Sequence, residues 1–248
     1  MPNTITLRPS APGQQPDERN RLLKALSPEV YARLVDEAES LELGAKQVLW
    51  PAGVPIRSVY FPRTCVVSLI VPLHEDRPIE AATVGNEGFV GAPVALGVQT
   101  TTITAIAQVA GTGLRLPAAT FAALNSEHAE LRLLVLAHAH TLMEQAAQTV
   151  ACNRRHELSE RCARWLLMTH DRVGASSFGL TQDFLAIMLG VRRAGVTVAA
   201  GTLQRAGLLK YSRGRVEVLD RDGLEAASCE CYRVLADSYE RAVRLPPS

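Results

Sequence analysis

The spacing of apolar residues changes twice along the chain, from helical to strand-like and back to helical. From Arg21 to about Ser40 the spacing is helical, with a break at Ser27-Pro28, where a serine cap and a proline at the first position predict a new helix. From Leu41 to Leu116 the apolar runs are short and are separated by glycine or proline, which favours an antiparallel roll or sandwich. The predicted strands are Gln47–Trp50, Ser58–Phe61, Cys65–Val71, Ile79–Val84, Thr102–Val109 and Gly113–Leu116.

Helical spacing returns at Pro117, and a longer helix is predicted over Ser126–Cys152. An apolar stripe at this spacing either pairs with the same helix of a second copy or is buried within its own domain. The stripe consists of Leu131, Leu134, Val135, Leu142, Ala146 and Val150, and a polar set, His138, Thr141, Gln145 and Gln148, accompanies its lower part. Further helices are predicted over Glu157–Asp171 and over Asp220–Val243, the latter with Leu224, Tyr232 and Leu235 facing inward.

The stretch from Leu180 to Leu219 combines two short helices with a hairpin. Thr181 is a suitable N-cap for the first helix, and the second begins at about Arg192. Ala186, Gly190 and Val196 have the spacing of a helix-turn-helix, in which a small residue lies at the crossing, a glycine makes the turn and an apolar residue fills the angle. After Gly207, the runs Leu208–Tyr211 and Arg215–Leu219 flank a turn at Ser212-Arg213-Gly214. A helix-turn-helix followed by such a hairpin predicts a winged helix.

The exposed face of the second helix has the chemistry of a DNA-reading surface. Arg192 and Arg193 lie at its N-terminal end, where recognition helices contact base edges, and Thr197 and Val198 follow one turn later. Basic residues on the hairpin suit phosphates. The alternative is a small helical subdomain with an ordinary solvated basic face. The predicted DNA-binding residues are Thr181, Gln182, Arg192, Arg193, Thr197, Val198, Thr202, Lys210, Arg213 and Arg215.

Charge and composition support this interpretation. The chain of 248 residues has a net charge of +1, but residues 151–219 carry 11 Lys and Arg against 5 Asp and Glu. Such an asymmetry favours a polyanionic partner. The proline-rich residues 1–19 are predicted to be a flexible tail rather than a signal peptide. The five cysteines, without CxxC pairing, favour a cytoplasmic location, and we expect no contact with a membrane.

Two groups of residues resemble metal ligands. His138-Ala-His140-x3-Glu144 follows the metal-binding pattern of cupin enzymes, but on a helix the two histidines point about 200° apart. Cys229-Glu-Cys231 is expected to diverge for the same reason, which leaves ordinary thiols as the interpretation and redox sensing as the alternative. We therefore predict no metal and no cofactor.

The motif LTQDFLAIMLGV, followed by Arg193, Val196, Leu203 and AGLL, resembles the DNA-binding domain of the Crp–Fnr family of bacterial transcription regulators. The resemblance implies an eight-stranded β-roll sensor, a long helix that pairs in a homodimer, a two-fold symmetric double-stranded DNA site and RNA polymerase as a further partner. Arg193 corresponds to the family's base-reading arginine. The family's following glutamate is Ala194 here and its second arginine is Val198, so the target sequence of the best-known members does not transfer.

The sensor departs from the cyclic-nucleotide binders of this family. Their ribose-binding and phosphate-binding motifs correspond to Gly88-Phe89-Val90-Gly91 and Thr101-Thr102-Ile103. Phe89 replaces a ribose-binding glutamate and Thr101 replaces a phosphate-binding arginine. Glu87 restores a carboxylate only through a one-residue shift, and spacing does not support Arg115 as a substitute cation. The predicted ligand pocket comprises Phe89, Val90, Thr101 and Thr102, and we expect it not to bind cyclic nucleotides. The effector stays unknown.

The sequence thus predicts an α+β protein: a jelly-roll-like antiparallel β-roll sensor, a long dimerisation helix and a C-terminal winged helix-turn-helix. The predicted boundaries are a tail at 1–19, the sensor at 20–125, the dimerisation helix at 126–152, the DNA-binding domain at 153–220 and a helical extension at 221–248. Two alternatives remain: a cupin-like metal-dependent enzyme, and a cyclic-nucleotide-regulated subunit that does not bind DNA.

Overall fold

The computed structural model describes residues 18–73 and 78–244. Most of the predicted tail therefore lies outside the described residues, but its end does not behave as a tail. The Glu18 side chain is buried and forms an ion pair with Arg63 at 2.5 Å, and it accepts a hydrogen bond from the Tyr31 hydroxyl. The folded sensor thus includes Glu18, two residues before the predicted boundary.

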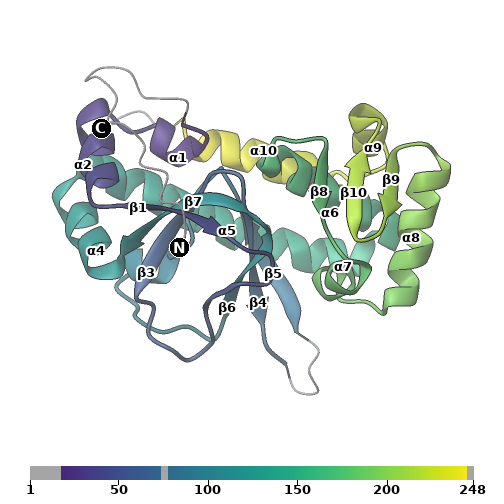
Figure 1. Cartoon of the computed structure of the whole chain (residues 1–248), viewed down its shortest axis with the longest axis horizontal. Helices are drawn as coiled ribbons and strands as arrows, with labels where there is room; N and C mark the ends of the chain where they lie inside the picture. Colours follow the sequence, from purple (N-terminus) through teal and green to yellow (C-terminus); the bar gives the residue numbers. More distant parts are fainter. Residues whose placement is uncertain (1–17, 74–77, 245–248) are drawn as a thin grey trace, which may run out of the picture.

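The sensor is built from two antiparallel sheets with helices at one end (Figure 1). Its three-stranded sheet has the order β1-β7-β3, and its four-stranded sheet has the order β2-β6-β4-β5. The strands are β1 (Glu39–Leu43), β2 (Val48–Trp50), β3 (Ser58–Pro62), β4 (Val66–Val71), β5 (Ile79–Val84), β6 (Thr104–Val109) and β7 (Gly111–Pro117). The helices beside them are α1 (Arg21–Lys24), α2 (Pro28–Asp36), α3 (Ala92–Ala95) and α4 (Ala118–Glu127).

All six strands predicted for the sensor are present, and two further elements of the sensor were not predicted. Strand β1 lies where the sequence predicted the end of a helix. It was missed because its residues are mostly exposed and show no clear alternation. Helix α3, a single turn after Gly91, was also not expected. Within the described residues the roll has seven strands rather than the eight that the resemblance implies. The roll closes through an isolated bridge between Tyr60 and Val90.

Helix α5 (Ala129–Arg155) runs along the whole molecule behind the roll (Figure 1). Its N-terminal half packs into the sensor core through Leu131, Leu134 and Val135, together with residues of α1, α2 and α4. The predicted apolar stripe is therefore partly a core face: these three residues cannot also form a contact with a second copy. Leu142, in the same stripe, packs against the interior of the roll.

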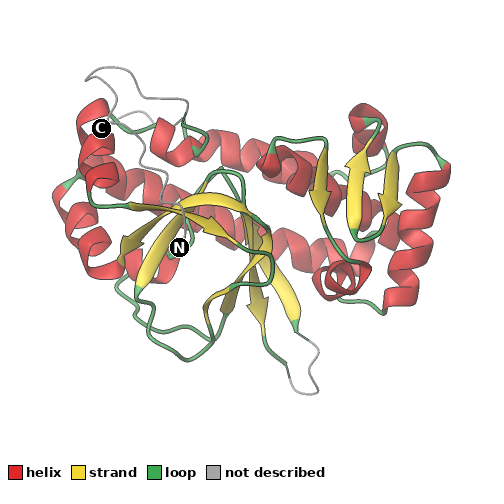
Figure 2. Cartoon of the chain, viewed as in Figure 1, coloured by secondary structure: helices red, strands yellow, loops and turns green. Residues whose placement is uncertain are grey.

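The C-terminal third is a compact winged helix (Figure 2). Its small sheet has the order β8-β10-β9; β8 was not predicted, because three residues carry too little pattern. Helix α10 returns along α5, and Leu224, Tyr232 and Leu235 are buried as expected. The elements are α6 (Leu158–Val173), β8 (Ser177–Gly179), α7 (Gln182–Leu189), α8 (Arg193–Arg205), β9 (Leu209–Ser212), β10 (Arg215–Val218), α9 (Arg221–Ala226) and α10 (Cys231–Ala242).

The sensor and the winged helix share apolar contacts. One hydrophobic cluster joins residues of α6, α7 and α8 to Val66, Ile70 and Val109 of the roll. Helix α7 also contacts β5. Within the described residues no single helix is long and apolar enough to cross a membrane, and the bent pair that reaches the required length and composition is α7 with α8.

Candidate nucleic-acid interface

The helix-turn-helix forms as its spacing predicts. The Thr181 hydroxyl accepts a hydrogen bond from the backbone N–H of Phe184 at 3.2 Å, and Gly190 ends α7 in the left-handed conformation with φ 64°. The axes of α7 and α8 then differ by 102°, within the usual range for this motif. Ala186 and Val196 are buried. They keep the two helices packed against each other and thereby fix the exposed face of α8.

That face carries the predicted base-reading side chains. Arg193 is the first residue of α8, and Arg192 is its N-cap rather than a helical residue. Arg193, Thr197, Val198 and Thr202 are all exposed, and Val198 is 66% exposed although it is apolar. In Figure 1, α8 lies at the outer edge of the molecule, away from the sensor. An apolar side chain held in water beside an arginine suits a contact with thymine methyl groups.

Helix α7 supplies partners that sequence reasoning did not assign. Asp183 lies 3.5 Å from a guanidinium nitrogen of Arg193, and the Thr197 hydroxyl donates to Oε1 of Gln182 at 3.0 Å. Gln182 was predicted as a DNA contact; Asp183 was not, because an acidic residue does not fit a polyanion-binding surface. Both members of the Arg193–Asp183 pair are well exposed, so the pair is weak and DNA can displace Asp183.

The hairpin between β9 and β10 has a two-residue turn, Arg213-Gly214. Arg213 and Gly214 both have positive φ, 50° and 74°, as a two-residue hairpin turn requires. Lys210, Arg213 and Arg215 are exposed, and Arg215 donates to the Ser177 hydroxyl at 2.9 Å. The wing therefore presents exposed cations beside α8, which is the arrangement that phosphate contacts need.

The sensor has an apolar cavity of about 400 Å³ between the roll and α5. Of the residues predicted for a ligand pocket, Val90 and Thr101 lie in its lining, whereas Thr102 is exposed and is not part of the lining. Phe89 contributes to the wall, but its ring is fully buried and packs against Phe121, with 5.4 Å between ring centroids. Among the described residues that line it there is neither lysine nor arginine, and His140 is the one basic side chain.

Neither substitute for the missing cyclic-nucleotide contacts reaches this cavity. Arg115 forms an exposed ion pair with Glu39. Glu87 is buried and lies 2.7 Å from a guanidinium nitrogen of Arg172 on α6. The same guanidinium bonds the hydroxyl and the carbonyl oxygen of Thr83 and the hydroxyl of Tyr239. Glu87 is thus held by the winged helix instead of facing a ligand.

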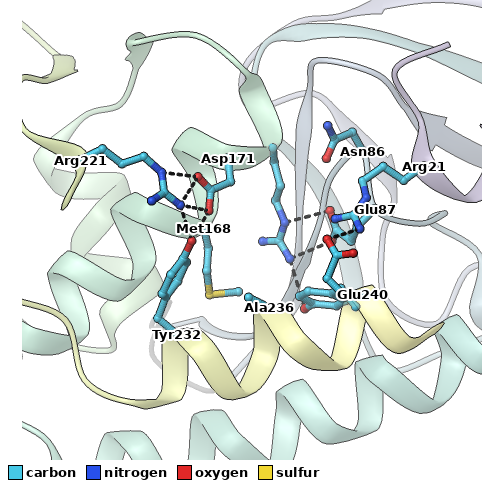
Figure 3. A pocket seen from close by; sticks show the side chains of 11 residues that line it. Arg21, Asn86, Glu87, Met168, Asp171, Arg221, Tyr232, Ala236 and Glu240 are labelled. Carbon is cyan, nitrogen blue, oxygen red and sulfur yellow. Dashed lines mark hydrogen bonds and ion pairs between the residues drawn. The ribbon is translucent and has the colours of Figure 1, made fainter. Parts of the chain in front are cut away.

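A second cavity, of about 330 Å³, opens beside this ion pair (Figure 3). Arg221, Asp171 and Tyr232 form a linked group on one side of it, and Arg21 pairs with Glu240 on the other. Neighbouring groups, the Tyr232 hydroxyl and Arg221 among them, hold the pKa of the Asp171 carboxyl below its usual range despite its burial. These charged groups are paired within the protein, and the cavity lies where the sensor meets α6 and α10.

The cupin interpretation fails on geometry. His138 is buried on one side of α5, with its Nε2 3.1 Å from the carbonyl oxygen of Phe89, and burial lowers its pKa to about 4. His140 is exposed on another side of the helix, beside Glu144. The two histidines cannot share a metal, as their helical spacing predicted.

The expectation for the cysteines was wrong. Cys229 precedes α10, and Cys231 is the first residue of that helix, so the divergence of about 200° between positions i and i+2 of a helix does not apply to this pair. They converge with Cys152 and His156, and the four ligand atoms all lie within 4.8 Å of one another. The pattern missed at the level of sequence is Cys152-x3-His156, which puts a thiol and an imidazole on the same face at the end of a helix.

Comparisons with known proteins agree with this architecture. Residues 160–227 match the family described as the Crp-like helix-turn-helix domain. The chain is similar to the structure of FixK2 from Bradyrhizobium japonicum, with a TM-score of 0.63 and 16% identity over 77% of this chain and 98% of that chain. It is also similar to TTHB099, a CRP-family transcriptional regulator from Thermus thermophilus, with a TM-score of 0.62 and 22% identity over 76% of this chain and 96% of that chain.

A third similar structure is the c-di-GMP responsive global regulator CLP of Xanthomonas campestris, with a TM-score of 0.61 and 16% identity over 77% of this chain and 99% of that chain. No curated protein matches the sequence of the chain. At these identities the solved structures establish the fold, and the match over residues 160–227 identifies the DNA-binding domain.

Proposed function

Because the chain belongs to the Crp–Fnr family of DNA-binding transcription regulators, we propose that it reads a pseudo-palindromic DNA site as a homodimer. Arg193 reads a base edge in each half-site, and Thr197 and Val198 add contacts on the same face of α8. Phosphates are bound by the wing, through Lys210 on β9, Arg213 in the turn and Arg215 on β10. The observation that carries this assignment is the exposure of the Arg193 face of α8, including an apolar side chain that no part of the described chain covers.

The proposal of a homodimer rests on the free face of α5. Leu136, Met143 and Val150 are 42%, 70% and 72% exposed, and they follow one another at seven-residue intervals. A seven-residue repeat of apolar residues on one helix face is the pattern of a paired coiled coil. This face, rather than the buried Leu131–Val135 segment, is where two copies of α5 meet. Such a dimer presents two copies of α8 about 34 Å apart, one turn of DNA.

The effector proposed for the sensor is a small, largely apolar molecule. The cavity of about 400 Å³ is lined by Trp50, Leu69, Ile103, Leu142 and other apolar side chains, and the part of the chain that the structure describes adds no lysine or arginine to this lining. A cyclic phosphate placed there would lose its hydration without a cation to replace it, which costs several kcal/mol. We therefore propose that cyclic AMP and cyclic GMP do not bind, and that the c-di-GMP response named for CLP does not extend to this cavity.

The DNA-reading assignment is tested with two variants. DNA that the wild-type protein selects from a randomised pool serves as the specific probe, and unselected DNA of equal length serves as the non-specific one. Arg193→Ala is expected to weaken specific binding by about 1–3 kcal/mol and to relax preference at one base pair in each half-site. Arg213→Ala is expected to lower the affinity for both probes by the same factor and to reduce the dependence of affinity on salt concentration.

Fluorescence anisotropy titrations at several salt concentrations measure both effects. Equal losses for the two variants, across both probes and all salt concentrations, would contradict the separation into a reading helix and a phosphate-binding wing. An unchanged affinity for Arg193→Ala on selected DNA would remove Arg193 from the reading surface.

A further inference from the structure

Three thiols and one imidazole meet where α5 ends and α10 begins. We call Cys152, His156, Cys229 and Cys231 the Cys3His cluster. Its four ligand atoms lie within 4.8 Å of one another. The sulfurs of Cys152 and Cys229 are 3.6 Å apart, and the Cys231 sulfur is 3.4 Å from Nδ1 of His156. All three cysteines are free and buried.

These distances fit a tetrahedral metal centre. With metal–sulfur bonds of about 2.3 Å and metal–nitrogen bonds of about 2.0 Å, the edges of a tetrahedron are about 3.8 Å between sulfurs and about 3.5 Å from sulfur to nitrogen. The two observed separations agree with these edges to within a few tenths of an ångström. A disulfide between Cys152 and Cys229 would instead require the two sulfurs to approach to about 2.05 Å.

The surroundings of the Cys3His cluster have the features of a metal site. Nε2 of His156 lies 3.2 Å from a carboxylate oxygen of Glu230, so the hydrogen on Nε2 faces the carboxylate and the Nδ1 lone pair faces the sulfurs. Metal-binding histidines usually have such a carboxylate partner on the other ring nitrogen. The Gln148 side-chain amide donates to the Cys231 sulfur at 3.0 Å, which stabilises a thiolate.

A buried positive charge also lies close to the sulfurs. The Arg164 side chain is only 5% exposed. The charge of Arg164 acts on both Cys152 and Cys229. Three thiolates on a divalent ion leave one net negative charge, and a neighbouring guanidinium compensates for it.

We propose that Cys152, His156, Cys229 and Cys231 bind one Zn²⁺ per chain in a closed, tetrahedral, structural site. Thiolate and imidazole ligands in this number are those that structural zinc sites use, and four protein ligands leave no open position for catalysis. The Zn²⁺ ties the C-terminal extension to the end of α5.

The site lies at the connection between α5 and α6 and at the start of α10. Helix α5 ends at Arg155, His156 is its C-cap, and α6 begins at Leu158. The short connection between these helices joins the long helix to the winged helix. A metal bound to His156 and to both cysteines of the α10 segment fixes this connection and holds α10 against α5.

The test measures metal content and spectra of the full chain. Protein purified without a chelating tag and dialysed against metal-free buffer is expected to hold one Zn²⁺ per chain by elemental analysis. Cys152→Ser and Cys229→Ser are expected to hold close to none. Cys162→Ala is the matched control, because Cys162 is equally buried but lies outside the Cys3His cluster, and it is expected to retain the full Zn²⁺ content.

Refolding with Co²⁺ in place of Zn²⁺ gives a second readout. Wild type and the Cys162→Ala control are expected to show the visible bands of tetrahedral Co²⁺ with thiolate ligands, and Cys229→Ser is expected to lose them. Zn²⁺ supplied to metal-free wild type at about 100 times its dissociation constant is expected to raise the melting temperature by about 5–10 °C.

Four results would overturn the proposal. The first is reduced wild type that holds no metal and shows no Co²⁺ bands. The second is a Cys152–Cys229 disulfide in protein handled under reducing conditions. The third is iron with inorganic sulfide in place of Zn²⁺. Retention of Zn²⁺ by both cluster variants would overturn it as well, because the metal would then lie elsewhere.

Discussion

Replacing Arg172 by methionine tests how much one buried ion pair between the sensor and the winged helix contributes to stability. The side chains of Arg172 and Glu87 are 5% and 2% exposed, and their charged atoms are 2.7 Å apart. Arg172→Met keeps most of the apolar stem but removes the guanidinium. The Glu87 carboxylate would then remain buried without a cation.

The expected loss of unfolding free energy in Arg172→Met follows from this burial. At an effective dielectric constant of about 20, charges 2.7 Å apart attract by roughly 6 kcal/mol, and the desolvation of both ions offsets much of that attraction. Losing one partner of a buried pair typically costs about 3–5 kcal/mol, because the stranded charge is no longer compensated. For a chain of this length we expect a fall in melting temperature of about 10 °C.

A double-mutant cycle isolates the pair. Glu87→Gln added to Arg172→Met removes the stranded charge, so the double variant is expected to be more stable than Arg172→Met alone. Urea unfolding of the wild type, both single variants and the double variant gives the coupling energy, which we expect to exceed about 2 kcal/mol. Arg33→Met is the control, because the Arg33–Glu37 pair is exposed and is expected to contribute less than about 0.5 kcal/mol. If the losses of unfolding free energy in the two single variants simply add in the double variant, the reasoning is refuted.

Three further predictions use other parts of the structure. Val150→Glu, on the free face of α5 and outside the cavity lining, is expected to shift the protein from dimer to monomer in sedimentation without lowering the melting temperature of the monomer; an unchanged dimer would place the interface elsewhere. Isothermal titration with cyclic AMP is expected to show no binding tighter than about 10 μM, and tighter binding would show that the cavity is misassigned. Burial raises the pKa of Glu80 to about 7, so folding keeps this carboxyl protonated where the unfolded chain ionises it. Relative to Glu80→Gln, the wild type is therefore expected to lose up to about 3 kcal/mol of unfolding free energy as pH rises from about 4.5 to 7; parallel urea-unfolding curves over that range would refute this.

The elements with strong local signals could be predicted from the sequence. Thr181, Gly190 and Val196 each have one suitable conformation or position in a helix-turn-helix, and the structure gives them those roles. The six predicted strands were recovered because glycine and proline separate them. Strand β1 was missed because its exposed residues do not alternate, and α3 was missed because a single turn has no measurable period.

The contacts between the sensor and the winged helix could not be predicted. Arg172 reads as one more basic residue of a basic segment, and its burial against Glu87 depends on how two domains pack. The Trp165 indole donates to Glu80 at 2.9 Å for the same reason, across a separation of 85 residues. The Cys3His cluster combines residues 152 and 156 with residues 229 and 231, and helical periodicity alone led to the wrong conclusion because Cys229 lies outside the helix.

These interdomain contacts connect the loop that lines the sensor cavity to the DNA-binding domain. Val90 lines the cavity, and Glu87, three residues earlier in the same loop, pairs with Arg172 of α6. Arg172 also bonds Tyr239 of α10. A ligand can shift the protein toward one arrangement only if it contacts that arrangement more favourably. Because the loop cannot move far without breaking a buried ion pair, a ligand that displaces Val90 must either leave the pair intact or move α6 with it. A ligand that displaced Val90 would therefore act on the winged helix through Arg172, because this side chain joins the loop to α6 and α10.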